Sequence, residues 1–146
     1  MDPEAKTCPL VVAGGNCSLN GYDAAGDEQF WTVTGDNVAA LTFLDWDGDG
    51  SEELLVGSDD QSIRAFKGEE FVHDIQEMSK IAHLTRFGGN RSLFGYALQN
   101  GGYGVYHSKK RLWRQKAKDK VTSMLGLEFD IEGQLVLVVG FSSGVV

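Results

Sequence analysis

The chain has 146 residues, of which 42% are hydrophobic, and its formal net charge at pH 7 is −8. This length and composition suit one globular domain with a hydrophobic core, and the negative charge argues against general nucleic-acid binding. No apolar run approaches the roughly 20 residues that a membrane-spanning helix needs, so we expect a soluble protein.

Residues 1–9 are expected to be a lead-in, partly linker sequence, because the repeat begins near Leu10. They lack the basic start and apolar core of a signal peptide, so no export is indicated. The two cysteines, Cys8 and Cys17, are predicted to be reduced thiols, since one pair in a chain of this length is weak evidence for an oxidising compartment. The sequons at 16–18 and 90–92 are interpreted as turns.

An internal repeat organises the chain from residue 10 onward. Residues 38–63 (VAALTFLDWDGDGSEELLVGSDDQSI) align without gaps on residues 121–146 (VTSMLGLEFDIEGQLVLVVGFSSGVV) at an offset of 83. Residues 93–106 and 10–22 align with parts of residues 53–66, at offsets of 40 and 44. A period of 40–44 residues is typical of β-propeller blades.

Each repeat predicts four short antiparallel strands, so the expected fold class is all-β, with propeller blades of the WD40-like or FG-GAP-like kind. We expect blade units at 10–37, 38–80, 81–120 and 121–146, the last one incomplete. Innermost strands are expected at 41–44 and 123–127, and outer strands at 30–33, 71–75 and 112–115. Because a propeller typically closes with about 4 to 8 blades, we interpret the chain as part of an incomplete propeller.

The stretch DWDGDGSEELLVGS, residues 45–58, has the composition of a metal-binding loop. Its aspartates offer hard oxygen ligands, and the glycines at 48 and 50 allow a tight turn. An EF-hand is excluded, because its twelfth position is Val56 and a strand follows the loop. The pattern resembles the DxDxDGxxD calcium loop of integrin α-type propellers, which implies five ligands for one structural Ca²⁺ ion: the side chains of Asp45, Asp47 and Asp49, the Ser51 backbone carbonyl and the Glu53 carboxylate.

The alternative is a metal-free acidic turn whose aspartates accept hydrogen bonds from backbone N–H groups. Three uncompensated carboxylates in one turn repel one another, which favours a bound cation. The equivalent loop of the last repeat, residues 128–133, lacks the ninth ligand and is expected to have lost its metal.

No catalytic constellation is visible, and His73, His83 and His107 are interpreted as surface residues. The GGYG sequence at 101–104 is interpreted as a turn. Residues 109–120 carry seven of the 13 basic residues. We interpret this run as a solvated outer strand and loop; the alternative is a patch for an acidic partner or for anionic lipid headgroups.

Four motifs stand in a characteristic order: GGNC at 14–17, FWTVTGDNV at 30–38, DWDGDGSEELLVGSDDQSIRAFK at 45–67 and FGYALQNGGYGVY at 94–106. In this combination the chain resembles the propeller of the Bardet–Biedl syndrome 2 family of BBSome subunits. The resemblance implies a non-enzymatic scaffold of a coat-like complex that carries membrane proteins to and from cilia. Its implied partners are other BBSome subunits and ciliary membrane-protein cargo, with peripheral membrane association through the complex and no nucleic acid.

The implied location is the cytoplasm, the cilium, the basal body and the periphery of the ciliary membrane. The alternative function is that of an extracellular calcium-dependent adhesion propeller of the integrin α type, which the acidic loop and the sequons would fit.

Overall fold

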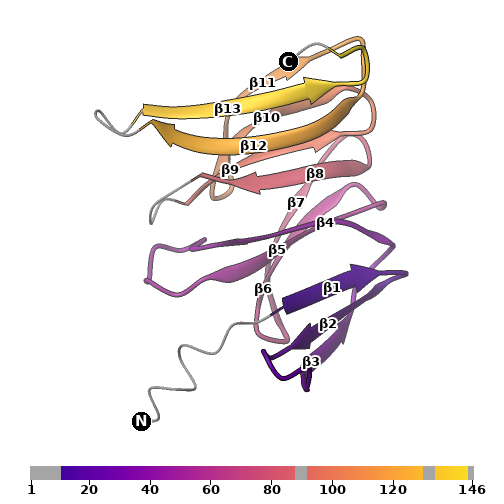
Figure 1. The fold of residues 1–146 in the computed structure, drawn as a ribbon, viewed down its shortest axis with the longest axis vertical. Coiled ribbons are helices and arrows are strands. Elements are labelled where there is room, and N and C mark those ends of the chain that lie inside the picture. Colours follow the sequence, from indigo (N-terminus) through magenta and orange to yellow (C-terminus); the bar gives the residue numbers. More distant parts are fainter. Residues whose placement is uncertain (1–10, 88–91, 130–133, 145–146) are drawn as a thin grey trace.

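The computed structural model describes residues 11–87, 92–129 and 134–144, and every regular element in these ranges is a β-strand (Figure 1). The thirteen strands are β1 (Val11–Gly15), β2 (Ser18–Tyr22), β3 (Glu28–Val33), β4 (Val38–Leu44), β5 (Glu53–Ser58), β6 (Ser62–Lys67), β7 (Glu70–Gln76), β8 (Ile81–Arg86), β9 (Leu93–Leu98), β10 (Gly102–His107), β11 (Lys110–Lys116), β12 (Val121–Phe129) and β13 (Gln134–Phe141).

The strands form four antiparallel sheets in chain order, namely β1-β2-β3, β4-β5-β6-β7, β8-β9-β10-β11 and β12-β13. The sheets follow one another along the long axis of the molecule (Figure 1). The first strands of successive sheets are neighbours, because β4 packs beside β8 and β8 packs beside β12. This is the arrangement of propeller blades, and it confirms the predicted all-β fold class.

Irregularities in strand pairing repeat with the sequence period. In the first strand of a sheet, the register shifts at residues 38–40, 81–83 and 121–123. In the strand that pairs with the outermost one, it shifts at 21–22, 65–66 and 105–106. A β-bulge bends a strand and increases its twist, so the repeated bulges give successive blades the same shape.

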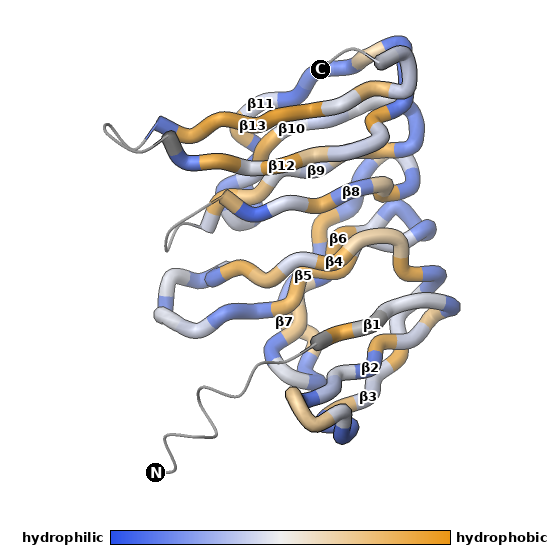
Figure 2. Tube along the Cα trace, viewed as in Figure 1, coloured by the Kyte–Doolittle hydropathy of each residue, from blue (hydrophilic) through white to orange (hydrophobic). Residues whose placement is uncertain are grey.

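The hydrophobic core lies between the sheets, and the second strand of a blade contributes to two core layers. Successive side chains of a strand point to opposite faces: Leu54 and Val56 pack with Leu19 of the first sheet, whereas Leu55 packs with Phe94 of the third. All six residues of β5 are buried. This double burial explains why Leu54, Leu55 and Val56 are three consecutive apolar residues. Figure 2 shows hydrophobic stretches along the inner strands.

The outer strands β3, β7 and β11 contain the predicted ranges, and β4 and β12 contain the predicted innermost ranges. One detail differs from expectation: Gly101 lies in a turn with φ of 92°, but Gly102 already begins β10. Residues 1–9 lie outside the described residues.

Candidate metal site

The acidic loop, residues 45–52, joins β4 to β5. It is closed by the residue pair Leu44 and Glu53, which are opposite each other in the antiparallel ladder. Gly48 and Gly50 have φ values of 76° and 89°, in the left-handed region that residues with a Cβ seldom adopt. The loop therefore turns where the sequence supplies glycine, and it places the three aspartates on one small patch.

The aspartates hold the loop together through its own backbone. Asp45 is buried, and its Oδ1 and Oδ2 accept hydrogen bonds from the N–H groups of Gly48 (2.9 Å) and Gly50 (3.0 Å). Asp47 accepts one from Asp49 (3.2 Å), and Asp49 accepts two from Ser51, from its N–H and its hydroxyl (both 2.8 Å). This is the geometry that the metal-free alternative expected.

Glu53 is the feature that the metal-free alternative does not explain. Its side chain is 2% exposed, and its Oε2 accepts a hydrogen bond from the Trp46 N–H at 2.7 Å. Among the residues that the structure describes, none donates a hydrogen bond to its Oε1. Burial, and then the charges of Asp47 and Asp49, raise the pKa of Glu53. A buried oxygen without a donor is costly, and a cation bound at the loop would satisfy it.

The oxygen donors of the loop fit a calcium ion. One carboxylate oxygen from each of Asp45, Asp47 and Asp49 lies within 4.8 Å of the other two. These carboxylates are the hard oxygen donors that Ca²⁺ prefers. Glu53 is not among the three residues of this cluster, so its role as a ligand and that of the Ser51 carbonyl stay predictions.

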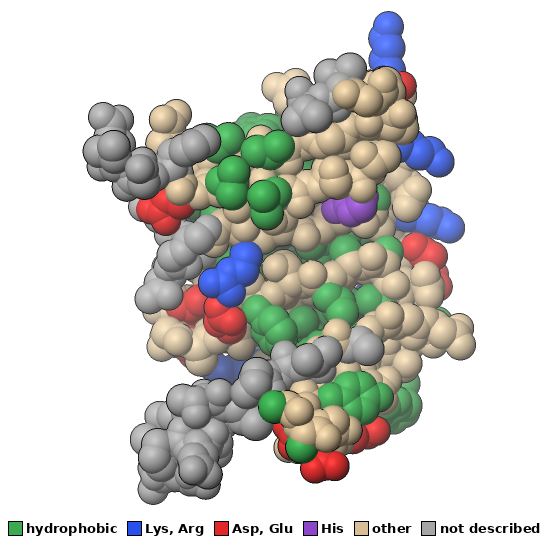
Figure 3. All heavy atoms as spheres, viewed as in Figure 1, with side chains coloured by type: hydrophobic (Ala, Val, Ile, Leu, Met, Phe, Trp, Pro, Cys, Tyr) green, Lys and Arg blue, Asp and Glu red, His purple; other side chains and the backbone are tan. Residues whose placement is uncertain are grey.

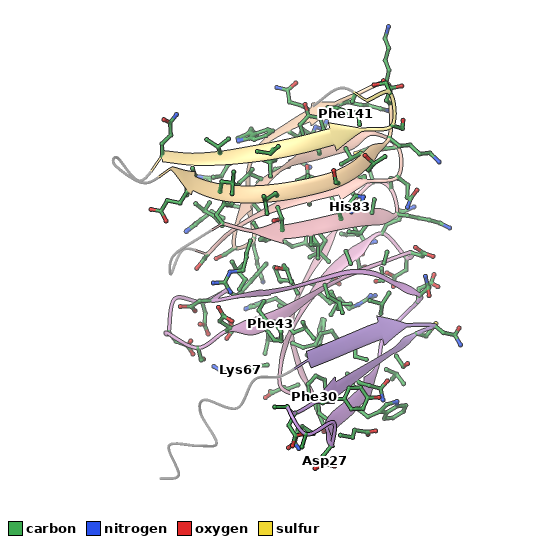
Figure 4. All side chains as sticks on the ribbon, viewed as in Figure 1. Asp27, Phe30, Phe43, Lys67, His83 and Phe141 are labelled. Atoms are coloured by element: carbon green, nitrogen blue, oxygen red, sulfur yellow. The ribbon has the colours of Figure 1, made fainter. Side chains whose placement is uncertain are left out.

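Lys67 is the residue that sequence analysis missed. It is the last residue of β6, and its Nζ lies 2.8 Å from Asp49 Oδ2 and 3.8 Å from Glu53 Oε1. The hydrogen bond from Lys67 holds the pKa of Asp49 well below its usual range, and Asp49 raises the pKa of Lys67. Figure 4 labels Lys67 near the loop between β4 and β5. The β4–β5 and β6–β7 hairpins turn at the same end of the blade. This topology follows from the predicted four-stranded repeat, and it could have indicated that Lys67 lies near the acidic loop.

The next blade fixes the acidic loop from the other side. The hydroxyls of Ser92 and Ser108 donate hydrogen bonds to the carbonyls of Asp45 (2.6 Å) and Trp46 (2.7 Å). Arg86 Nη1 in β8 lies 2.5 Å from Glu52 Oε1. Figure 3 shows acidic and basic side chains next to each other on this side of the molecule. The loop is thus part of the contact between two blades.

The remaining sequence-predicted residues do not join this site. Residues 130–133 of the last repeat and residues 88–91 of the middle repeat lie outside the described ranges. Two histidines differ from the expected surface placement, because His73 and His83 are half-buried. His73 stacks on Trp46 with ring centroids 5.6 Å apart, and His83 Nε2 lies 3.1 Å from the Val121 carbonyl oxygen. His107 is exposed.

The basic run forms the outermost strand of the third sheet. All seven residues of β11 are exposed, as expected for a solvated edge. Arg111 departs from that expectation, since its Nη1 lies 3.5 Å from Oε1 of the buried Glu77. The Tyr106 hydroxyl donates a hydrogen bond to the same oxygen, and burial and this bond raise the pKa of Tyr106.

Large hydrophobic side chains are exposed on the outer strands. Trp31 in β3 is 52% exposed, Phe71 in β7 52% and Trp113 in β11 42%. The three residues occupy the outermost strand of three successive sheets. Each of these three outermost strands therefore carries one exposed aromatic side chain.

No helix of the structure, within the part of the chain that it describes, is long and apolar enough to cross a membrane.

Sequence comparisons relate the chain to proteins of the cilium. Residues 40–146 match the family model described as ciliary BBSome complex subunit 2, middle region. BBSome complex member BBS2 of Rattus norvegicus and that of Homo sapiens are each 46% identical over 136 residues, which are 93% of this chain and 19% of each relative. BBSome complex member bbs-2 of Caenorhabditis elegans is 38% identical over 128 residues, 88% of this chain and 17% of that relative. The chain therefore spans a small part of the relatives that it matches.

Solved structures with a similar fold have low sequence identity. Crystals of BBS1N in complex with ARL6DN superpose with a TM-score of 0.76 at 18% identity when soaked with lead, covering 98% of this chain and 44% of that chain. The mercury-soaked crystal gives a TM-score of 0.74 at 16% identity, covering 92% and 44%. Chaetomium thermophilum Raptor gives 0.67 at 16% identity, covering 91% and 14%. At these identities the likeness shows the fold alone.

Proposed function

Because the chain belongs to the BBSome complex subunit 2 family, we propose that it contributes a non-enzymatic interaction scaffold to the BBSome. In this proposal its partners are other BBSome subunits and the membrane-protein cargo of a coat-like complex that serves the cilium. It works in the cytoplasm and the cilium and reaches the membrane only through the complex. Family membership favours this function over the adhesion propeller, whose support is limited to the acidic loop and the sequons.

The observation that carries the scaffold proposal is the exposure of one aromatic side chain on each of three outermost strands, namely Trp31, Phe71 and Trp113. Exposed aromatic side chains are enriched at protein interfaces and depleted elsewhere on soluble surfaces. Each of the three is about half exposed and lies on an outermost strand, where a partner can reach it.

The test is co-purification of the full-length subunit with the other BBSome subunits. We expect the triple variant Trp31→Ser, Phe71→Ser, Trp113→Ser to fold, as judged by its circular dichroism spectrum and melting temperature, but to lose at least one partner. The double variant Lys109→Glu, Lys110→Glu is a matched control on an equally exposed surface and should keep every partner. Retention of all partners by a folded triple variant would remove the support that these three side chains give.

We also propose that the acidic loop holds one structural calcium ion through Asp45, Asp47, Asp49, the Ser51 carbonyl and Glu53. The orphaned Oε1 of Glu53 supports this, because it is buried at the ninth position of the loop. The ion would neutralise the carboxylates and lock the turn between β4 and β5. A ligand that binds only the folded state stabilises it in proportion to RT ln(1 + [L]/Kd).

Calcium should therefore raise the melting temperature, and a chelator should lower it. Asp47→Ala should lower the melting temperature in calcium and abolish the response to the ion. If calorimetry detects no calcium binding at about millimolar concentration and the melt ignores the chelator, the loop is only an acidic turn.

A further inference from the structure

We propose that the ammonium group of Lys67 is an internal counter-ion of the acidic loop, which competes with calcium for the same carboxylate oxygens. The inference rests on the calcium site proposed above and concerns how that site is regulated. Lys67 comes from a different hairpin, the one between β6 and β7, so the competitor is brought to the loop by the fold of the blade.

The contacts of Lys67 place its charge at the metal-binding oxygens. Its Nζ is 2.8 Å from Asp49 Oδ2, a hydrogen-bond distance, and 3.8 Å from the orphaned Glu53 Oε1, which is too long for a hydrogen bond. These two oxygens come from the fifth and ninth positions of the loop pattern, and the ammonium approaches both. A calcium ion coordinated by them at about 2.3–2.6 Å would lie next to Nζ, where the repulsion between two cations is strong.

Lys67 partly satisfies the loop but does not complete it. An ammonium group donates at most three hydrogen bonds from one point charge, and here it hydrogen-bonds Asp49 and only approaches Glu53. Calcium takes 6 to 8 oxygen ligands, so it can bind all the carboxylates of the loop together. Lys67 therefore holds the loop in shape without metal and gives way when calcium is abundant.

Lys67 is also free to leave without disturbing the strand. Its side chain is 48% exposed, whereas that of Glu53 is 2% exposed. Its backbone pairs with Glu70 across the hairpin, and Gly68 forms the turn with φ of 62°. The displaced ammonium can rotate into solvent near the exposed carboxylates of Glu69 and Glu70 while the ladder stays intact.

The experiment measures calcium affinity by titration calorimetry on the full-length subunit. Lys67→Met removes the charge and keeps most of the stem, Lys67→Arg keeps the charge, and Lys80→Met is the matched control on another exposed lysine. We expect Lys67→Met to bind calcium about fivefold more tightly or better, on the scale of one exposed ion pair. Lys80→Met should bind like the wild type, and Lys67→Arg should show no such gain. In chelator, Lys67→Met should melt below the wild type, and calcium should reverse the order.

The outcomes separate this inference from the calcium site itself. Equal affinity of the wild type and Lys67→Met would overturn the competition and leave the calcium site standing. If Lys67→Met binds calcium and the wild type does not, the result would support both the calcium site and the competition by Lys67. Absence of binding by every variant at about millimolar calcium would overturn the calcium site and the competition with it.

Discussion

The acidic loop and the basic strand β11 carry opposite charges, and their side chains are held in opposite ways. Each aspartate of the loop accepts at least one backbone hydrogen bond, and Glu53 is buried behind them. The cations of β11 are all exposed, and Arg111 is the one for which the structure shows a contact with a buried carboxylate. Charged side chains that the backbone holds in one geometry can bind a particular ion. Charged side chains that are surrounded by solvent interact weakly and with many partners.

Asp45→Ala removes an anchor of the acidic loop, and of the variants considered it is expected to lower the free energy of unfolding most. It removes a buried carboxylate that accepts hydrogen bonds from Gly48 and Gly50. Two charge-assisted bonds are lost while the exposed glycine N–H groups regain water, so we expect the free energy of unfolding to fall by about 2 kcal/mol. Urea denaturation in the presence of chelator measures this without a contribution from calcium. A loss of less than about 0.5 kcal/mol would show that Asp45 does not organise the loop.

Arg111→Glu tests whether Arg111 belongs with the fixed charges. The substitution places a carboxylate beside the buried Glu77 and removes the cation that faces it. Because Arg111 is partly exposed, we expect a moderate loss, about 1 kcal/mol, in the free energy of unfolding. Lys110→Glu, one residue away on the same strand, is the control and should change stability by less than about 0.5 kcal/mol. Equal effects of the two changes would place Arg111 with the solvated charges.

Reversing the remaining charges of the edge should have the smallest effect. The triple variant Lys109→Glu, Lys110→Glu, Lys116→Glu alters exposed side chains and leaves Arg111 in place. Assembly of the full-length subunit into its complex, measured by co-purification, should be unchanged. Lost assembly with folding preserved would instead favour the alternative that the basic run binds an acidic partner or anionic lipid.

Local patterns predicted most of the fold, because a blade repeats them. The apolar run 54–56, the glycines at 48 and 50 and the self-alignment at offset 83 were sufficient to predict the strands and the acidic loop. The same local signals predicted that Asp45, Asp47 and Asp49 would lie close together, whereas the ligand roles of Ser51 and Glu53 stay predictions. The boundaries of the blade units stay a prediction.

Contacts between hairpins and between blades could not be predicted in the same way. Lys67 lies 18 residues from Asp49, and Ser92 lies 47 residues from Asp45, so nothing in their local sequence indicates that they meet. The prediction that His73 and His83 lie on the surface was wrong for the same reason. Their burial depends on contacts with distant residues, namely Trp46 for His73 and the backbone of Val121 for His83.

The most direct test of the calcium site is a crystal structure of the chain grown with calcium. We predict an ion bound by Asp45, Asp47, Asp49, the Ser51 carbonyl and Glu53, with oxygen distances of about 2.3–2.6 Å and the Lys67 side chain turned away. A loop without an ion at saturating calcium, with Lys67 still hydrogen-bonded to Asp49, would contradict it.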